Sequence, residues 1–289
     1  QLETDKLFCN CPSEIKKDNP DFIISRLLRV SAGETGKVDI AAKHEKKKAK
    51  SFVYQGYYDT TCLVETDDEP PQEVNHEALL VALQVSKLLN ATIVDKIQFM
   101  RKVVIDGSNV SGFQRTALIA RNGHINVQGK KIDILSVCLE EESCQAVKRT
   151  KDQDTYNLSR LGIPLIEIAT SAYIASPEHC KAVSEHLGMI LRSTGKVKRG
   201  IGTIRQDVNV SIKKGARVEI KGFQDLRSIP KVIEYEVERQ MSLIKKPKEE
   251  VRKAESNLTT AFLRPMPGAS RMYPETDVKS IEVTKELLA

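Results

Sequence analysis

The chain has 289 residues, of which 40% are hydrophobic, so it can bury a substantial core as one large domain or two ordinary ones. Its 45 Lys and Arg exceed its 39 Asp and Glu, and the net charge of +6 is compatible with a polyanionic partner without demanding one. No run approaches the roughly 18 to 20 consecutive apolar residues of a membrane-spanning helix. The first residues, QLETDKLF, lack a signal-peptide pattern. We therefore expect a cytoplasmic protein that contacts no membrane.

Six cysteines are too few for a disulfide scaffold in a chain of this length. Cys9 and Cys11 are close enough in sequence for both thiolates to reach one metal ion, and Cys62 could supply a third ligand. These three residues are a candidate Zn²⁺ site. Because structural zinc sites usually have four protein ligands, the count favours the alternative of small buried thiols.

The first half of the chain alternates between strand and helix patterns. The segment 51–65 alternates as strands do, and 73–90 has apolar residues at a helical period, with Asn75 as a cap. Strand, Gly-rich turn and strand follow over 93–123, and short strands continue over 126–149. The basic run at 43–50 is expected to be a solvated loop.

The second half adds two helices. The segment 176–195 opens with a Ser-Pro-Glu start signal and ends at a glycine. A further helix is predicted over 229–245, with one apolar face formed by Ile233, Val237, Met241 and Ile244. Strands and helices interleave and hairpins are prominent, which predicts an α+β fold with a mainly antiparallel sheet and flanking helices.

A predicted hairpin carries an unusual polar face. We predict strands over 203–212 and 216–222, joined by Lys213, Lys214 and Gly215. With this loop, odd-numbered residues of one strand oppose odd-numbered residues of the other, and Gly215 lies where a left-handed conformation is often needed. The pairing sets Ser211 against Arg217, Asn209 against Glu219, and Asp207 against Lys221. Arg205 lies on the same face, and the opposite face is apolar: Ile204, Val208, Val210, Ile212, Val218 and Ile220.

Two interpretations of this polar face remain open. Cross-strand ion pairs on a solvent-facing sheet would each contribute on the order of 0.2 to 1 kcal/mol. Short Asp, Asn and Ser side chains, however, are poor strand formers. They suit a cleft in which carboxylates hold a divalent cation and basic groups hold phosphate oxygens. The composition favours the cleft modestly.

Two further stretches have the same character. Three consecutive glutamates, at 140–142, end a predicted strand, where a cation or solvent must relieve their repulsion, and a solvated loop is the commoner case. The segment 106–112 strings small residues with accessible backbone amides between two apolar strands. Such amides can approach phosphates closely, although a plain Asp-Gly turn is the alternative.

Six motifs, in one order along most of the chain, closely resemble the GatB/GatE family of glutamyl-tRNA(Gln) amidotransferase subunits, and within it the archaeal GatE branch. The motifs are MRKVVIDGSNVSGFQRT, CLEEES, YNLSRLGIPLIEIAT, GKVKRGIGTIRQDVNVSI, ARVEIKGFQDL and RPMPGASRMYPETDV. The resemblance implies an ATP- and Mg²⁺-dependent ligase that phosphorylates the γ-carboxylate of glutamate carried by tRNA(Gln). It also implies a heteromeric complex, in which ammonia from an asparaginase-like amidase subunit displaces the phosphate.

The resemblance implies roles for particular residues. The magnesium-binding carboxylates would be Glu140 or Glu141, together with Glu219. Contacts to ATP, phosphate and the glutamyl group are expected from two sets of residues. The catalytic set is Lys102, Asp106, Ser108, Arg205, Asp207, Asn209 and Lys221, and the nucleotide-binding set is Gln114 and Arg115.

The resemblance also implies a domain plan. A cradle catalytic domain, similar to glutamine synthetase in fold, is expected over 1–246, and a short linker at 247–250 replaces the family's synthetase-like insertion. The segment 251–289 completes the cradle. The family's upstream Gly-Leu-Glu-Ile-His motif, whose Glu and His join the metal site, is not among these residues, so we expect the chain to be a fragment of the family's protein.

Two rival functions remain. An inactive scaffold of this family would bind tRNA or a partner subunit without catalysis. A stand-alone ligase would activate a small-molecule carboxylate. No Cys-His or Thr-Lys amidase signature is present, so ammonia must come from elsewhere in either enzymatic case.

Overall fold

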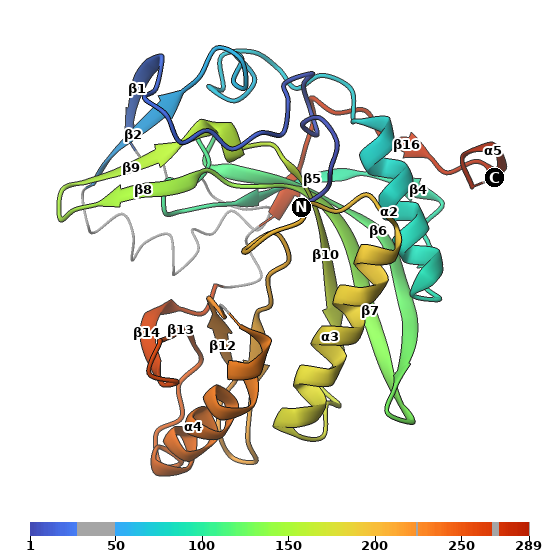
Figure 1. Ribbon diagram of the computed structural model, residues 1–289, viewed down its shortest axis with the longest axis vertical. Helices are drawn as coiled ribbons and strands as arrows, with labels where there is room; N and C mark the ends of the chain where they lie inside the picture. The colour runs from blue at the N-terminus through green and yellow to red at the C-terminus, as the bar shows by residue number, and fades with distance from the viewer. Residues whose placement is uncertain (28–49, 224, 268–271, 289) are drawn as a thin grey trace. The chain divides into compact units, whose positions relative to one another are not determined.

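The computed structural model describes residues 1–27, 50–223, 225–267 and 272–288 (Figure 1). Its internal contacts divide the chain into two compact units. Unit 1 comprises 1–123, 134–169 and 268–289, and unit 2 comprises 124–133 and 170–267. The expected linker at 247–250 lies within unit 2, and all of the basic run at 43–50 except Lys50 lies outside the described residues.

A six-stranded sheet forms the centre of unit 1. Its strand order is β10-β7-β6-β5-β15, and β3 also pairs with β6. The pairs β5–β6, β5–β15 and β3–β6 are antiparallel. The strands are β3 (Thr92–Ile93), β5 (Phe99–Val103), β6 (Phe113–Val127), β7 (Lys130–Glu141), β10 (Pro164–Thr170) and β15 (Met272–Pro274). The tip of the β6–β7 hairpin, 124–133, belongs to unit 2.

A second sheet of unit 1 has the order β1-β2-β9-β8, with β2 and β9 parallel and the other pairs antiparallel. Its strands are β1 (Phe22–Leu27), β2 (Ser51–Gly56), β8 (Gln145–Arg149) and β9 (Gln153–Asn157), followed by the short helix η1 (Leu158–Arg160). Helix α2 (His76–Leu88) begins as predicted, because the Asn75 side chain accepts a hydrogen bond from the Ala78 amide. The remaining elements are β4 (Lys96–Ile97), β16 (Ile281–Glu282) and α5 (Lys285–Leu288).

Unit 2 packs two helices against a four-stranded sheet of order β11-β12-β13-β14. The elements are α3 (Pro177–Ser193), β11 (Val208–Val210), β12 (Val218–Lys221), η2 (Leu226–Ser228), α4 (Ile229–Ser242), β13 (Glu250–Ala254) and β14 (Thr260–Pro265). The predicted start of α3 is confirmed, since Ser176 Oγ accepts from the His179 amide. The core unites Val208, Val210, Val218 and Ile220 of the hairpin with Ile229, Val232 and Ile233 of α4.

The predicted hairpin is confirmed in pairing but not in extent. Asn209 opposes Glu219 as expected, although the strands are only 208–210 and 218–221. The left-handed residue of the loop is Lys214, with φ of 67°, rather than Gly215. A glycine at 215 avoids a steric clash instead, because a Cβ there would lie 2.6 Å from Ile212 Cγ1 and 2.7 Å from Gln240 Oε1.

The predicted apolar face of α4 is partly wrong. The helix ends at Ser242, Met241 is 60% exposed, and Ile244 lies beyond the helix and is 40% exposed. The buried side includes two polar residues, Glu236 and Gln240. Polar residues inside an apolar period are hidden from a pattern that counts only apolar side chains.

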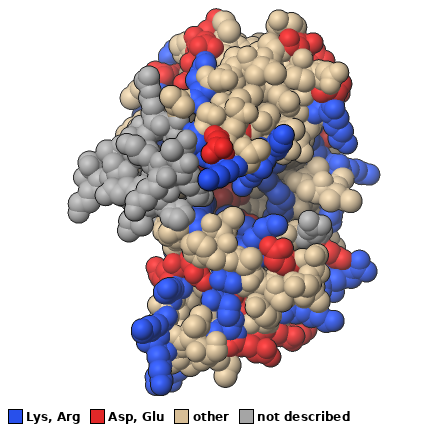
Figure 2. Space-filling model, turned by 90° about the vertical axis from the view of Figure 1, so that its left-hand side faces the viewer, with Lys and Arg blue, Asp and Glu red and all other residues tan. Residues whose placement is uncertain are grey.

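The α+β class with mainly antiparallel sheets is confirmed. Among the described residues, no helix is both long enough and apolar enough to cross a membrane. Figure 2 shows Lys and Arg interspersed with Asp and Glu over one face of the molecule, so the net charge of +6 is not gathered there into a single patch.

The buried carboxylate of Glu236 ties α4 to the sheet of unit 2. Its side chain is fully buried, and Arg239 donates to both of its oxygens at 2.9 and 2.7 Å. Thr260 Oγ1 of β14 donates at 2.9 Å and Gln240 Nε2 at 3.1 Å. Burial acts to raise the pKa of Glu236, but these hydrogen bonds outweigh it and hold the pKa below its usual value.

We expect Glu236→Gln to lower the free energy of unfolding of the full chain by about 2–3 kcal/mol at neutral pH. This is less than the usual loss for a broken buried ion pair, because Glu250 still pairs with Arg239 and Arg252. The folded-state pKa lies below the ordinary value of 4.5, so this stabilisation is present above about pH 4.5 and disappears as the pH falls further. Denaturant unfolding from pH 7 to pH 3 measures both effects.

Glu238→Gln is the matched control, since Glu238 is exposed on the same helix. Its stability should change by less than about 0.5 kcal/mol. Equal stability losses in the two variants would contradict a special role for Glu236.

Candidate active site and metal cluster

The central sheet of unit 1 carries two polar networks, one on each face. Lys102 opposes Gln114 across β5 and β6, and Arg101 opposes Arg115. Opposed residues of antiparallel strands share a face, whereas successive residues point to opposite faces. Lys102 and Gln114 therefore lie on one face of the sheet, and Arg101 and Arg115 lie on the other.

The first face, called here the Lys102 face, centres on Glu140 of β7. Lys102 Nζ and Thr116 Oγ1 donate to Glu140 Oε1 at 2.5 and 2.6 Å, and Gln114 Nε2 donates to Oε2 at 3.3 Å. The side chain of Glu140 is 5% exposed and that of Lys102 is 13% exposed. The carboxylate is thus held firmly, and the ammonium beside it keeps some access to solvent.

Glu167 of β10 is an exposed carboxylate close enough to influence Cys138 of β7, and the sequence reasoning missed it. β10 is the neighbour of β7, and Cys138 stands two residues before Glu140 on β7. Burial first, then the charges of Glu140 and Glu167, raise the pKa of Cys138 to about 12. A lone glutamate in the apolar stretch PLIEIA was the available signal.

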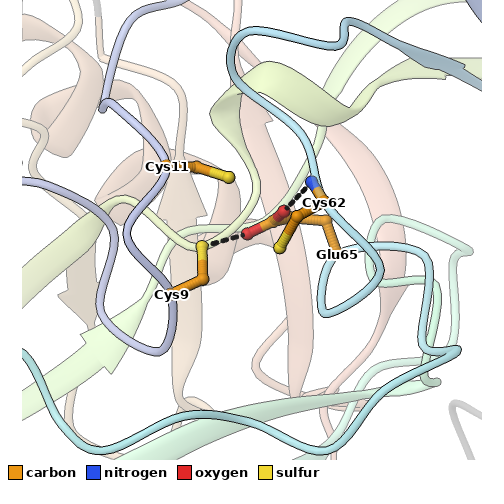
Figure 3. Close-up of side chains that lie close together, drawn as sticks. All are labelled: Cys9, Cys11, Cys62 and Glu65. Atoms are coloured by element: carbon orange, nitrogen blue, oxygen red, sulfur yellow. Dashed lines mark hydrogen bonds between the residues drawn. The ribbon is translucent and has the colours of Figure 1, made fainter.

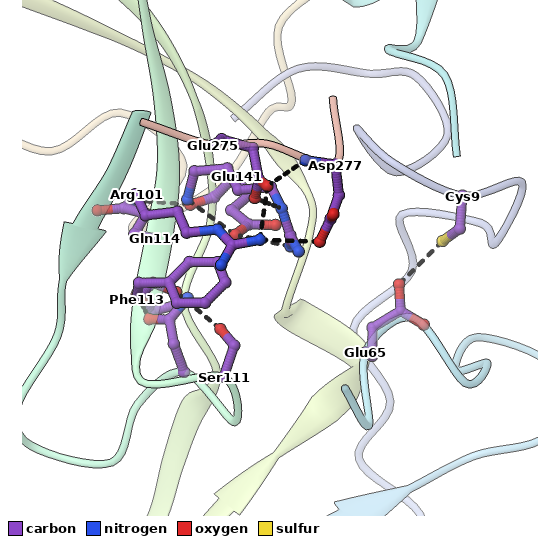
Figure 4. Close-up of polar contacts among 12 residues, drawn as sticks. Cys9, Glu65, Arg101, Ser111, Phe113, Gln114, Glu141, Glu275 and Asp277 are labelled. Carbon is purple, nitrogen blue, oxygen red and sulfur yellow. Dashed lines mark hydrogen bonds and ion pairs between the residues drawn. The ribbon is translucent and has the colours of Figure 1, made fainter. Parts of the chain in front are cut away.

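The second face, called here the Arg115 face, pairs two arginines with two buried carboxylates. Figure 4 labels Arg101, Glu141 and Glu275 of this group. Arg115 Nε donates to Glu275 Oε2 at 2.7 Å, and its backbone amide donates to Glu141 Oε1 at 2.9 Å. Arg101 Nη2 donates to Glu275 Oε1 at 2.7 Å and to Asp277 Oδ2 at 2.8 Å. Glu275 directly follows β15, so a segment far along the chain from both arginines completes this network.

Aromatic rings enclose the Arg115 guanidinium. Its Cζ atom lies 5.4 Å from the ring centroid of Phe8 and 5.1 Å from that of Phe113. Arg101 also lies over the Phe113 ring, with its Cζ atom 4.6 Å from the centroid. Cation–π contact and burial together fix the Arg115 guanidinium in one position.

Opposing effects set the pKa values of the two carboxyl groups. Burial dominates at Glu141 and raises its pKa, against the charge of Arg115. At Glu275, burial is outweighed by the hydrogen bonds from Arg101 and the Asp277 amide and by the charge of Arg115, so its pKa is lowered. Glu275 therefore holds its charge more firmly than Glu141 does.

Internal hydrogen bonds and packing hold the loop at 106–112 in one turn. Asp106 Oδ1 accepts from the amide and the hydroxyl of Ser108, at 3.1 and 2.6 Å. Tyr54 and Tyr156 donate to the carbonyls of Gly107 and Asp106, at 2.6 and 2.5 Å. Gly107 has φ of 78°, and a Cβ there would collide with the Phe52 ring. The small residues are explained by this packing as well as by any ligand.

The hairpin of unit 2 carries its own polar group. Lys221 Nζ donates to Asp207 Oδ2 and contacts Glu219. Burial acts to lower the pKa of Lys221, but the charges of Asp207 and Glu219 outweigh it and raise the pKa. Asn209 and Arg205 are exposed nearby in sequence. The predicted site residues therefore fall into separate groups, two in unit 1 and one in unit 2.

Three thiols and a carboxylate meet in unit 1 (Figure 3). One ligand atom from each of Cys9, Cys11, Cys62 and Glu65 lies within 4.8 Å of the others. Cys9 Sγ donates to Glu65 Oε1 at 2.9 Å, and the Cys62 amide donates to Oε2 at 2.7 Å. Hydrogen bonds from Cys11 and Cys9 hold the pKa of Cys62 well below its usual value. Within the described residues, this is the one group of three or more acidic, Cys or His side chains arranged to hold a metal ion.

The structure thus adds four residues to the sequence-predicted set. Arg101 and Glu275 complete the Arg115 face, Glu65 joins the thiols, and Glu167 lies on the strand beside Cys138. The three glutamates at 140–142 are buried, with exposures of 4%, 5% and 3%, which excludes the solvated loop.

The whole chain, residues 1–289, matches the family described as GatB/GatE catalytic domain. It is similar to the Archaeoglobus fulgidus protein named as the E subunit of glutamyl-tRNA(Gln) amidotransferase, with 56% identity over 249 residues, 85% of this chain and 40% of that protein. Proteins of the same name from Methanococcus vannielii and Methanocaldococcus jannaschii are 56% and 54% identical over 84% and 85% of this chain. The chain spans 38% and 39% of those two relatives. It belongs to the GatB/GatE catalytic-domain family.

Proposed function

We propose that this chain is the catalytic part of an ATP-dependent amidotransferase acting on glutamate carried by tRNA(Gln). The names of its relatives support the substrate and the reaction. The observation that carries the proposal is the Lys102 face, where a partly exposed ammonium is held beside a buried carboxylate. A heteromeric complex with an asparaginase-like amidase subunit would supply the ammonia.

The proposed reaction has two steps. An oxygen of the γ-carboxylate forms a bond to the γ-phosphorus of ATP, the bond from that phosphorus to the bridging oxygen breaks, and ADP leaves. The lone pair of ammonia then forms the carbon–nitrogen bond, phosphate leaves with the carbon–oxygen bonding pair, and a proton passes to solvent. Phosphoryl transfer is catalysed mainly by positioning and by neutralising charge on the phosphoryl oxygens.

Lys102 is the residue that we assign to the phosphoryl oxygens. Its ammonium is one of three donors to Glu140, and Gln114 and Thr116 continue to hold the carboxylate when Lys102 turns towards a phosphate. Arg115 is different, because its guanidinium lies between aromatic rings and pairs with Glu275. We assign Arg115 to positioning Glu141 rather than to direct phosphate contact.

The carboxylates fit a magnesium ion in donor type. Glu140 offers hard oxygen ligands and already holds a cation, the Lys102 ammonium. In unit 1 the magnesium ligand would be Glu140 or Glu141, which point to opposite faces of the sheet and so do not share one ion. Glu219 of unit 2 is assigned to magnesium by the family resemblance alone. Bound magnesium would supply charge neutralisation at the phosphates. Lys221, fixed by Asp207 and Glu219, and the exposed Asn209 and Arg205 are assigned to phosphate or glutamyl contacts.

Lys102→Met should reduce phosphoryl transfer by about 100- to 1000-fold, the loss typical of removing one donor to developing charge. The measurement is transfer of labelled phosphate from ATP to Glu-tRNA(Gln) in the full-length complex with its amidase subunit. Lys130→Met, which changes an exposed lysine at the start of β7, should leave the rate unchanged.

Two outcomes would contradict the proposal. Normal transfer in Lys102→Met would remove Lys102 from the reaction. Tight tRNA binding without transfer in the wild-type complex would favour the scaffold instead.

Glu219→Gln should abolish phosphoryl transfer while leaving the fold intact. Asp207 still pairs with Lys221 in this variant, so the free energy of unfolding should change by less than about 1 kcal/mol. The same assay, with a melting curve, tests both statements, and Glu234→Gln on the exposed side of α4 is the control. Normal turnover in Glu219→Gln would remove Glu219 from the metal site.

A further inference from the structure

We propose that Cys9, Cys11, Cys62 and Glu65 form a Cys₃Glu zinc site, in which the Glu65 carboxylate is the fourth ligand. This site is separate from the phosphoryl-transfer chemistry proposed above. Glu65 is the fourth ligand that the three cysteines lacked.

The geometry is close to that of a bound site. In a tetrahedral zinc site with zinc–sulfur bonds of about 2.3 Å, neighbouring sulfurs lie about 3.8 Å apart. The four ligand atoms already lie within 4.8 Å of one another, so closure requires shifts of about 1 Å or less. The hydrogen bond from Cys9 Sγ to Glu65 Oε1 shows that a thiol and the carboxylate converge on one point.

The Glu65 carboxylate is oriented by fixed partners. The Cys62 amide donates to Oε2, which leaves Oε1 facing the Cys9 sulfur. Lys6 Nζ lies 3.6 Å from Oε1 and donates to the Thr60 carbonyl at 2.6 Å. Hydrogen bonds of this kind hold metal ligands in their binding orientation.

The local charge also suits a metal. Three thiolates and a carboxylate around Zn²⁺ carry a net charge of −2, and Lys6, which is fully buried, offsets one unit of it. Zinc binding releases the thiol protons to solvent, including the proton that Cys9 shares with Glu65. The nearby Asp59 is committed elsewhere, because it is 60% exposed and pairs with Lys16 at 2.5 Å.

The zinc site would connect an irregular segment of unit 1 to a neighbouring turn of the same unit. Residues 3–21 contain no helix or strand, and Cys9 and Cys11 anchor this segment to the turn that holds Cys62 and Glu65. Phe8, next to Cys9, packs edge-on against Phe99 and lies over the Arg115 guanidinium. Glu65, Arg115 and Glu141 also line one small cavity of about 20 Å³. The metal would thereby hold Phe8 in place against the Arg115 face.

X-ray absorption of the zinc-loaded wild-type chain tests the ligand set directly. We expect about one zinc per chain, with three sulfurs at about 2.3 Å and one oxygen at about 2.0–2.2 Å. Absence of zinc after loading, or a coordination shell with fewer than three sulfurs, would overturn the proposal.

Glu65→Gln tests whether the oxygen comes from Glu65 or from water. We expect zinc affinity, measured by competition with a chelator, to fall by at least about 10-fold, the smaller loss seen when even a supporting partner of a ligand is removed. Glu69→Gln, an exposed acid four residues away, should bind zinc as the wild type does. Equal affinity in all three proteins would exclude Glu65 as a ligand.

A melting measurement guards against misfolding of the variant. Removing zinc from the wild-type chain with a chelator should lower the melting temperature, because the metal binds only the folded state. An unchanged melting temperature on zinc removal and reloading would overturn the proposal whatever the fate of Glu65→Gln. Phosphoryl transfer enters none of these readouts, so failure here leaves the proposed function standing.

Discussion

Arg115 is the group on which the centre of unit 1 depends. It lies beside two buried carboxylates, Glu141 and Glu275, and an unpaired buried charge would cost several kcal/mol. Its guanidinium can satisfy both because it is planar and presents several donors, which a lysine ammonium cannot do in the same geometry. The rings of Phe8 and Phe113 exclude water from this pairing. The same side chains therefore pair the charges of the site and pack the core of unit 1.

The alternation of β-strands then gives the two faces different capacities. On the Arg115 face, both oxygens of Glu275 accept from arginines, which favours rigidity, although the buried Nε of Arg101 has no hydrogen-bond partner among the described residues. On the Lys102 face, Glu140 has three donors, of which the ammonium can leave without stranding the carboxylate. The sheet thus has one rigid face and one face on which the Lys102 ammonium can change partners. This combination is suited to holding a ligand whose charge changes during reaction.

Local features of the site were predictable from the sequence, and distant partners were not. Asn75 and Ser176 were identified as helix caps because a cap depends on residues within one turn. The opposition of Asn209 and Glu219 followed from loop length, although the left-handed position moved to Lys214. Glu275 was missed, since its partner Arg115 is 160 positions away and no periodicity links them. Glu65 stands only three residues after Cys62, and it was missed because its other partner, Cys9, is 56 positions away.

The order of segments along the chain adds a constraint on how the site forms. Arg101 and Arg115 precede unit 2 in sequence, whereas Glu275 follows it, so most of unit 2 is inserted between the partners of one ion-pair network. Closing a loop of this length costs conformational entropy, although the cost rises only slowly with length. Until Glu275 docks, Arg101 and Arg115 lack their shared carboxylate. The Arg115 face is therefore completed only when strand β15 joins β5, and the buried charge makes that docking a condition of a stable unit 1.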